Sequence, residues 1–214
     1  MKDLSDRTLL LLAGVLAATL TLVGCGPPRG PVAPGTGLVL PASTPGNPAS
    51  APVQPVDFRH DVHAGQLKID CLYCHTYAAK SPVANIPAVS VCMNCHRLIG
   101  GELSPLAGAP RDPAELQKVR SHYQQQITLV RGFWERQQSI PWISVYRLPD
   151  HAYFNHKRHV KAGLNCHACH GPVETMPRVY RYSSLKMGWC VTCHRQNLND
   201  KNFPATMDCV SCHH

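Results

Sequence analysis

The sequence predicts a fold of loops and short α-helices that lacks a conventional apolar core and is built around covalently attached groups. Hydrophobic residues make up 44% and aromatic residues 7% of the 214 positions, and 19 prolines limit regular structure. Such a composition gives a thin core for a chain of this length. Ten of the eleven cysteines form five Cys-x-x-Cys pairs, and a histidine follows each pair directly. The pairs are Cys71/Cys74, Cys92/Cys95, Cys166/Cys169, Cys190/Cys193 and Cys209/Cys212, followed by His75, His96, His170, His194 and His213.

The Cys-x-x-Cys-His unit is the attachment site of c-type haem, in which two thiols bond to the macrocycle and the adjacent imidazole ligates the iron. Disulfides and structural zinc also use paired cysteines, but neither requires a histidine after every pair. Five units therefore predict a multihaem cytochrome c, mostly loops and short α-helices wrapped around five covalently bound haems. The haems supply the missing interior, and the five adjacent histidines are the predicted proximal iron ligands.

The N-terminus carries an apolar segment with a basic flank. Lys2 and Arg7 precede an uncharged stretch from Thr8 to Gly24, which is typical of a short membrane-spanning helix or of a signal peptide. Cys25 follows in LVGC, which resembles a bacterial lipoprotein processing box, so a lipidated Cys25 is the alternative to an uncleaved anchor over residues 1–25. Both interpretations predict that the haem-binding part lies on the periplasmic side of the bacterial cytoplasmic membrane.

The remaining chain divides into four segments by composition. Residues 26–56 are rich in proline, glycine, serine and alanine and predict an extended tether. Residues 57–100 hold the first two haem motifs and residues 151–214 the other three, so a dihaem and a trihaem module are expected. The formal charge of +8 comes without a block of basic residues, so nucleic-acid binding is not expected, and haem propionates are the nearer anions.

Residues 101–150 predict a connecting helix followed by an extended segment. Asp112, Pro113 and Glu115 form a helix-start signal of capping residue, first-turn proline and acidic third position. Apolar residues then recur at helical spacing, which indicates a packing helix. They are Leu116, Val119, Tyr123, Ile127, Val130 and Trp134. His122, on the same helix, is interpreted as an ordinary surface histidine.

Two repeats of Phe-x-His-x-x-His precede the first and third haem motifs, as FRHDVH at 58–63 and FNHKRH at 154–159. This arrangement resembles the class III cytochromes c, particularly the trihaem c7 type. In that family the first histidine ligates the haem of the next motif and the second ligates the haem of a later one. The resemblance implies two c7-like modules with bis-histidine ligation by the pairs His60/His75, His63/His96, His156/His170 and His159/His194. His167, inside CHACH, is expected to face solvent.

The fifth haem departs from the c7 pattern. Where the family has a histidine before the middle motif of the trihaem module, this chain reads LKMGWCVTCH. Met187 is therefore the predicted distal ligand of the haem bound through His213, with Met176, His151 and His214 as alternatives. A thioether ligand would raise the potential of that haem above the others. Ligation across the two modules is a further alternative.

Six-coordinate irons leave no position for a substrate, so electron transfer rather than catalysis is predicted. The strings DCLYCHTYAAKS, IPAVSVCMNCH and LKMGWCVTCHR are similar to the pentahaem cytochrome c subunit of alternative complex III, a bacterial quinol oxidoreductase, over essentially residues 57–214. That resemblance implies integral membrane and iron-sulfur partner subunits, with a monohaem cytochrome c or another periplasmic acceptor downstream. Two alternatives are a stand-alone tethered electron carrier and a cytochrome that oxidises quinol itself. The latter is less favoured because some 45 residues separate Cys25 from Cys71.

Overall fold

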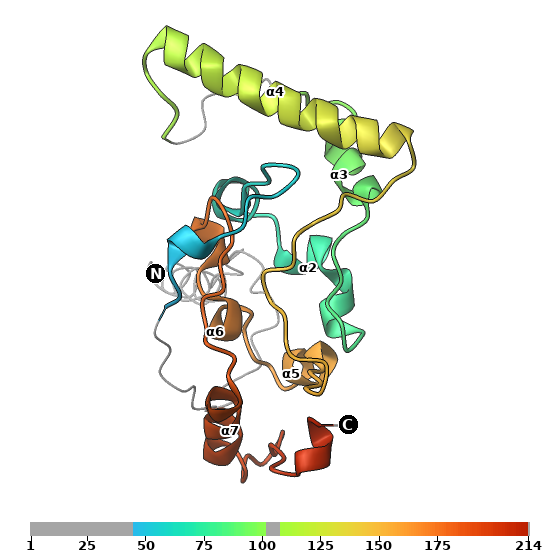
Figure 1. Cartoon of the computed structure of the whole chain (residues 1–214), viewed down its shortest axis with the longest axis vertical. Coiled ribbons are helices and arrows are strands. Elements are labelled where there is room, and N and C mark those ends of the chain that lie inside the picture. The colour runs from blue at the N-terminus through green and yellow to red at the C-terminus, as the bar shows by residue number, and fades with distance from the viewer. Residues whose placement is uncertain (1–44, 102–107, 214) are drawn as a thin grey trace, which may run out of the picture. The chain divides into compact units, whose positions relative to one another are not determined.

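The computed structural model describes residues 45–101 and 108–213 (Figure 1). The predicted anchor, Cys25 and most of the tether lie outside these residues, so those predictions stay untested. All described residues belong to one compact unit. Within the described ranges the chain is helical or irregular, without a β-strand. None of the helices in this part of the chain has both the length and the apolar character needed to cross a membrane.

Most helical elements are short, as expected for a chain that wraps around other groups. Only α4 exceeds ten residues among the described elements. In chain order the elements are η1 (Pro48–Ser50), η2 (Asp61–Gln66), α2 (Cys71–Cys74), η3 (Thr76–Ala79), α3 (Val89–His96), α4 (Pro113–Glu135), α5 (His156–Lys161), α6 (His167–His170), η4 (Val173–Thr175), α7 (Met187–Gln196) and η5 (Cys209–Ser211).

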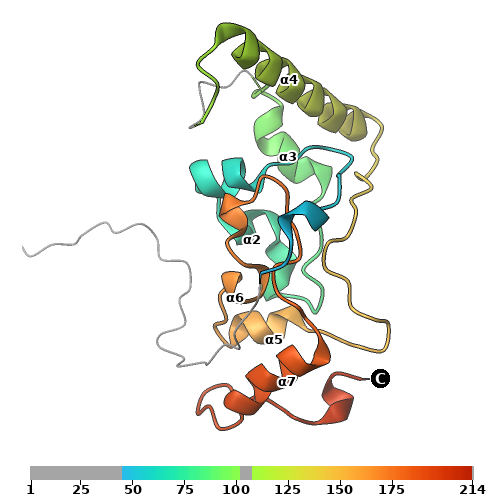
Figure 2. The same cartoon turned by 60° about the vertical axis from the view of Figure 1, so that its left-hand side comes forward.

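Helix α4 confirms the helix predicted between the two groups of haem motifs. The Asp112 carboxylate caps it by accepting the Glu115 N–H at 2.9 Å, and Pro113 opens the first turn. The helix packs on α3, and both views show these two helices next to each other (Figures 1 and 2). Of the predicted apolar stripe, Val130 is buried whereas Trp134 remains partly exposed.

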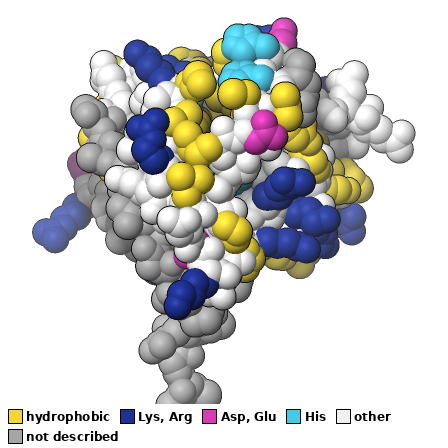
Figure 3. Space-filling view, turned by 90° about the horizontal axis from the view of Figure 1, so that it is seen from below, with side chains coloured by type: hydrophobic (Ala, Val, Ile, Leu, Met, Phe, Trp, Pro, Cys, Tyr) yellow, Lys and Arg dark blue, Asp and Glu magenta, His cyan; other side chains and the backbone are white. Residues whose placement is uncertain are grey.

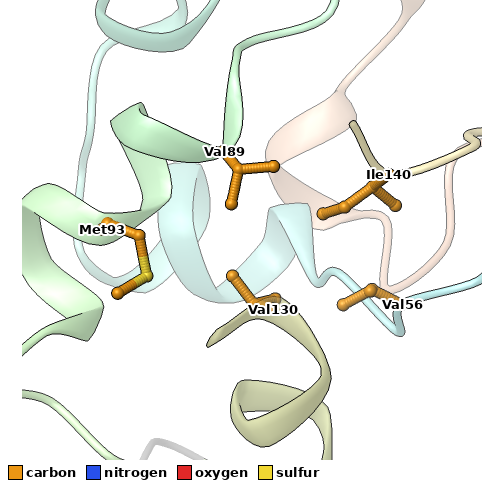
Figure 4. Close-up of a cluster of buried hydrophobic side chains, with 5 residues drawn as sticks. All are labelled: Val56, Val89, Met93, Val130 and Ile140. Atoms are coloured by element: carbon orange, nitrogen blue, oxygen red, sulfur yellow. The ribbon is translucent and has the colours of Figure 1, made fainter. Parts of the chain in front are cut away.

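Side chains from α3, α4 and the segments beside them form a small apolar cluster (Figure 4). Cys92, Phe133 and Trp142 pack against it without being fully buried. Among the described residues, few other hydrophobic side chains are buried, which agrees with the thin core predicted from composition. The cluster consists of Val56, Val89, Met93, Val130 and Ile140.

Polar bonds also join α4 to the segment that leads into the first haem motif. His122 Nε2 lies 3.0 Å from an Asp57 carboxylate oxygen, and the Asp57 N–H donates to the Gln126 side-chain oxygen at 2.8 Å. Arg59, paired with Asp61, donates to the Tyr123 hydroxyl at 2.9 Å. His122 is thus on the surface as expected, but it helps to hold the predicted connecting helix against residues 57–61.

The two groups of haem motifs interlock through reciprocal contacts. Element η2 precedes the first motif and packs on η4, which follows the third; α5 precedes the third motif and packs on η3, which follows the first. Asp61 N–H donates to the Met176 carbonyl at 3.2 Å, and His156 N–H donates to the Pro82 carbonyl at 2.9 Å. Each segment with predicted distal histidines is therefore positioned by the other half of the chain.

Candidate haem sites

All five Cys-x-x-Cys-His motifs lie on helical turns. A spacing of three residues places both thiols on the same side of a turn, and the histidine follows at once. In the first, third and fifth motifs the histidine N–H donates to the carbonyl of the first cysteine at 2.9 Å. This shared local geometry presents two sulfurs and one imidazole together, as covalent haem attachment requires.

The residue before the first cysteine caps three of these turns. The side-chain oxygen of Asp70 accepts the Leu72 N–H at 2.7 Å, and Asn165 accepts the His167 N–H at 3.0 Å. Asp208 likewise accepts the Val210 N–H at 3.3 Å. The second and fourth motifs need no such cap because they lie inside α3 and α7. The Asp or Asn before a cysteine is a sequence signal for an isolated helical turn.

Within the described ranges, none of the ten paired cysteines forms a disulfide. This part of the chain also has no cluster of three or more histidine, cysteine and carboxylate side chains arranged as a metal site. Each cysteine pair and its adjacent histidine together form one candidate haem attachment site.

The two thiols of the second motif differ in their surroundings. Cys92 is partly buried and packs against the apolar cluster, whereas Cys95, the other predicted attachment residue of this motif, is exposed. The Cys95 thiol therefore lies at the protein surface, whereas the Cys92 thiol packs against protein. The contact between α3 and α4 covers one part of the second motif. Cys95 lies toward the first motif: burial raises the pKa of Cys74 there, and the neighbouring Cys95 thiol raises it further.

Exposure of one thiol is not peculiar to the second motif. Cys71, Cys166 and Cys209 are also exposed, and each belongs to a pair whose other cysteine is partly buried. In the second motif it is the second cysteine, Cys95, that is exposed, and in the other three it is the first. One thiol of each of these four pairs is thus packed against protein and the other lies at the surface, which a covalently attached macrocycle would cover.

The two Phe-x-His-x-x-His repeats have the same side-chain geometry. Phe58 stacks on His63 with ring centres 4.3 Å apart and meets His60 edge-on at 4.8 Å. Phe154 stacks on His159 at 4.3 Å and meets His156 edge-on at 4.7 Å. The phenylalanine thus sets the orientation of both histidines in each repeat, which explains why it accompanies them in the sequence.

Three of the predicted histidine pairs face each other at a common distance. Ring centres are 6.2 Å apart for His63/His96, 6.5 Å for His156/His170 and 6.1 Å for His159/His194. Two metal–imidazole bonds of about 2 Å on opposite sides of one ion, with about 1 Å from each nitrogen to its ring centre, give a separation of about 6 Å. The three pairs are therefore spaced to fit one iron between the two rings.

His60 also lies close to its predicted partner. Burial lowers the pKa of His60 to about 4, and the neighbouring His75 lowers it further than His63 does. Burial likewise lowers the pKa of His170 to about 4, with smaller contributions from His156 and His75. Low pKa values keep both imidazoles neutral near pH 7, and the neutral imidazole is the form that ligates iron.

Hydrogen bonds fix the tautomer of most of these histidines. A carbonyl can only accept, so a ring Nδ1 beside a carbonyl carries the proton and leaves Nε2 to bind a metal. Among the proximal histidines, His75, His96, His194 and His213 bond the carbonyls of Asn85, Ile99, Thr206 and His151 at 2.7–3.1 Å. Among the distal ones, His63, His156 and His159 bond those of Arg59, Pro82 and Asn155 at 2.8–3.0 Å.

His122 and His167 show the opposite pattern. Each directs Nε2 at a carboxylate, His122 toward Asp57 at 3.0 Å and His167 toward Glu174 at 2.7 Å. A ring nitrogen engaged in this way is not available to a metal. The arrangement agrees with the sequence interpretation that neither histidine is an iron ligand, and it provides a partner for His167, which remains exposed.

The described ring that lies beside His213 is that of His151, one of the alternatives to Met187 for the fifth distal ligand. Met187 is the first residue of α7 and is 66% exposed, whereas the His151 ring lies nearly parallel to that of His213, with ring centres 5.8 Å apart and planes at 21°. Tyr153 N–H donates to the Cys212 carbonyl at 2.7 Å, which holds residues 151–153 against the fifth motif. The neighbour of His213 thus results from chain folding between distant segments and not from the order of ligands in a related family.

Of the other two alternatives for the fifth distal ligand, only Met176 lies within the described residues. Met176 is buried at 3% exposure, and its carbonyl accepts a hydrogen bond from Asp61. His214 lies outside the described residues.

Tyr146 contacts the histidine of the third Cys-x-x-Cys-His motif, a role that the sequence did not predict. Its ring meets His170 edge-on with centres 4.4 Å apart. The hydroxyl of this half-buried side chain donates to the Tyr180 carbonyl at 3.2 Å and accepts from Tyr182 N–H at 3.2 Å, and burial raises the pKa of Tyr146. Tyr146 thus connects the 101–150 segment to the third motif. No periodic or motif signal marks this residue in the sequence.

The thiols of different motifs lie close together in a fixed succession. Burial raises the pKa of Cys92 in the second motif, and the neighbouring Cys74 thiol of the first motif raises it further. Cys71 of the first motif hydrogen-bonds Cys166 of the third, which raises the pKa of Cys71. Burial, then the thiols of the fourth motif, raise the pKa of Cys169 to about 11.

The succession continues to the C-terminus. Burial raises the pKa of Cys190 in the fourth motif, and the neighbouring Cys212 thiol of the fifth motif raises it further. Both ribbon views show the corresponding elements in the order α3, α2, α6, α7 and then the C-terminal turn (Figures 1 and 2). The attachment sites therefore follow one another in the order second, first, third, fourth and fifth.

Comparison with known proteins agrees with this geometry. Residues 152–214 match the family model of cytochrome c7 and related cytochromes c. The chain is also similar to the multihaem cytochrome c subunit of menaquinone reductase from Nitratidesulfovibrio vulgaris, with 22% identity over 180 residues, 75% of this chain and 76% of the relative. The predicted c7 resemblance of the last three motifs is confirmed. Residues 152–214 are thus similar to the c7-type multihaem cytochromes, a family that implies covalently bound c-type haem and electron transfer.

Proposed function

We propose that this chain binds five c-type haems and is the electron-transfer subunit of a membrane quinol oxidoreductase of the alternative complex III type. The observation that carries the proposal is the placement of a second histidine opposite the proximal histidine of each of four motifs, with ring centres about 6 Å apart. His60 beside His75 completes a set of five. A closed pair of ligands leaves no iron position for a substrate and favours electron transfer.

The proposed ligand set has one change from the sequence prediction. The proximal ligands are the five histidines that follow the cysteine pairs, and His151 replaces Met187 as the distal ligand opposite His213. The remaining distal ligands are His60, His63, His156 and His159. Five bis-histidine sites predict a group of low potentials without the one high-potential haem that methionine ligation would give.

Bound c-type haems supply reversible one-electron chemistry between Fe(III) and Fe(II). The protein side chains hold each site in one geometry: carbonyls orient the imidazoles through Nδ1, and Phe58 and Phe154 stack on them. The succession of cysteine pairs supports a linear path from the second motif through the first, third and fourth to the fifth. Each transfer oxidises the donor by one electron and reduces the acceptor by one.

The proposed partners are integral membrane and iron-sulfur subunits on one side and a monohaem cytochrome c or another periplasmic acceptor on the other. The relative from Nitratidesulfovibrio vulgaris is named as a subunit of a menaquinone reductase, which supports a quinone-linked complex. Its name specifies quinone reduction, whereas the resemblance to alternative complex III implies quinol oxidation. The direction of flow depends on the potentials of the partners, so the assay must include both reactions.

The proposed location is the bacterial cytoplasmic membrane, with the haem-binding part on the periplasmic side. Residues 1–25 would serve as a membrane anchor, or Cys25 would carry lipid, and residues 26–56 would form the tether. The sequence supports this location through the basic flank and apolar stretch of the N-terminus.

The test is purification of the native protein from its membranes in mild detergent, with mass spectrometry of the haem-loaded chain and of co-purifying subunits. We expect a chain mass that includes five haems, recovery with integral membrane and iron-sulfur subunits, and quinol:acceptor or donor:quinone activity. A lone pentahaem protein, reduced only by added carriers, would instead establish the second candidate, a tethered electron carrier. A mass with fewer than five haems would contradict the cofactor assignment.

A further inference from the structure

The net charge is distributed unevenly along the chain. Residues 151–214 hold eight lysines and arginines against three aspartates and glutamates, whereas residues 57–100 hold four against three. Most of the formal charge of +8 therefore belongs to the part with the third to fifth motifs. Figure 3 views the end where α7 and the C-terminus lie, and Lys and Arg outnumber Asp and Glu on that face.

Helix α5 concentrates three of these basic residues on one side. At 3.6 residues per turn, Lys157, Arg158 and Lys161 fall within an arc of about 100° around the helix axis. The ligand candidates His156 and His159 lie on the opposite side of the same helix. All three basic side chains are exposed, and none forms an ion pair within the described part of the chain. Helix α5 thus separates a ligand face from a basic face.

The basic face adjoins the fifth motif. Arg158 lines a small pocket together with Tyr153, Asn155, Val210 and Ser211, and the last two lie between Cys209 and Cys212. Val210 is 67% exposed and Tyr153 is 44% exposed, so apolar surface lies beside the charges. An apolar centre with a charged rim is the usual composition of a protein–protein docking site.

The second and fifth motifs, at the two ends of the succession, differ in how the protein packs against them. Cys92 of the second motif packs against the apolar cluster under α4, whereas the turn of the fifth motif is exposed at Cys209, Val210 and Ser211. The turn of the fifth motif is therefore exposed beside the basic face of α5.

We propose that the basic face of α5, together with Tyr153 and Val210, is the docking surface for a redox protein with a carboxylate-rich face. This proposal rests on the proposed function and adds the chemical class of the partner. Long-range attraction between opposite charges raises the association rate and makes it sensitive to salt. The surface surrounds a haem-attachment motif, where a lipid headgroup has no electron to exchange, so an acidic protein fits better than an anionic membrane.

The test measures electron exit from the full-length, haem-loaded protein in detergent. The protein is first reduced and then mixed with an oxidised acidic plastocyanin, whose Cu(II) gains the one electron that the cytochrome loses. The second-order rate constant is measured by stopped flow at increasing ionic strength, and a basic monohaem cytochrome c serves as the comparison acceptor. We expect the rate with plastocyanin to fall as salt rises and the rate with the basic acceptor to rise.

Charge reversal identifies the surface. The double variant Lys157→Glu, Lys161→Glu should lower the low-salt rate with plastocyanin by about tenfold or more and flatten its salt dependence. The matched control is Arg111→Glu, Lys118→Glu on and beside α4, where both residues are exposed, and this variant should stay within about twofold of the wild type. Equal effects of the two double variants, or a salt-independent wild-type rate, would overturn the proposal.

Two further readouts separate this proposal from its rivals. If the reversal instead shifts the reduction titration or the haem spectrum, the lysines pair with haem propionates and the docking proposal fails. If wild-type protein binds vesicles of anionic lipid and the reversal abolishes that binding while plastocyanin kinetics stay unchanged, the surface is a membrane contact. Haem content and reduction are measured on the same samples, so loss of the five haems would indicate failure of the proposed function itself.

Discussion

The imidazole rings of His151 and His213 lie nearly parallel with their centres 5.8 Å apart, although 62 residues separate them in the chain. The His213 Nδ1 also lies 2.9 Å from the His151 carbonyl, so one residue supplies both a facing ring and the bond that orients its partner. Hydrogen bonding to a proximal histidine raises its basicity as a ligand. The pair therefore joins the fifth motif to the start of the segment 151–214.

Replacement of His151 tests the proposed ligand assignment for the fifth motif. His151→Ala should open one coordination position and convert about one fifth of the haem signal from low spin to high spin, and His151→Met should raise the potential of that haem. Spectroscopy and a reduction titration of the purified protein measure both effects. Met187→Leu is the control and should change neither. A high-spin signal in the Met187 variant and none in the His151 variants would restore the original prediction.

Local sequence patterns predicted most of the structure that surrounds the motifs. The capping residue Asp112 and the following apolar spacing marked α4, and the Phe-x-His-x-x-His repeats marked residues that the fold brings to the proximal histidines. These signals succeed because a helix start, and a phenylalanine stacked on a histidine five residues away, depend on neighbouring residues only. Each of these signals therefore predicts the local geometry of its own segment.

Contacts between distant segments were not predictable in the same way. Tyr146 lies 24 residues from His170 and His151 lies 62 residues from His213 in the chain, and folding brings each pair of rings together. The family pattern pointed to the position before the fourth motif, where this chain has Met187 instead of histidine. A ligand chosen by proximity in three dimensions leaves no fixed spacing in the sequence.

Tyr146 should position His170 rather than contribute chemistry. Tyr146→Phe removes the hydroxyl bonds to Tyr180 and Tyr182 and should lower the free energy of unfolding by about 1–3 kcal/mol, while Tyr146→Leu should also shift one haem potential because the edge contact with His170 is lost. Denaturant unfolding and redox titration measure the two effects. Tyr77→Phe, at an exposed position, is the control. A Leu variant with unchanged potentials would reduce Tyr146 to a packing role.

Gly65 permits the close contact between η2 and η4. A Cβ at this position would lie 2.3 Å from the Glu174 carbonyl oxygen, a backbone atom that cannot turn away. Gly65→Ala should therefore destabilise the protein by about 1–3 kcal/mol and disturb ligation by His63. The matched control is Gly188→Ala in α7, where nothing lies within 4 Å of the added Cβ and helix propensity predicts a gain of about 0.5–1 kcal/mol. Thermal unfolding of the haem-loaded variants gives both values, and equal stabilities would contradict the close packing.

The direction of the ring nitrogens separates ligands from ordinary histidines, and the pair His159 and His167 tests that rule within one module. His159 bonds a carbonyl through Nδ1 and faces His194, whereas His167 engages Glu174 through Nε2. His159→Ala should produce one high-spin haem and a changed reduction titration, because the distal ligand opposite His194 is lost. His167→Ala should keep all five haems low spin and lower stability by about 1 kcal/mol or less, the usual worth of an exposed pair. Electron paramagnetic resonance counts the high-spin centres, and a new one in the His167 variant would show that nitrogen direction does not identify the ligands.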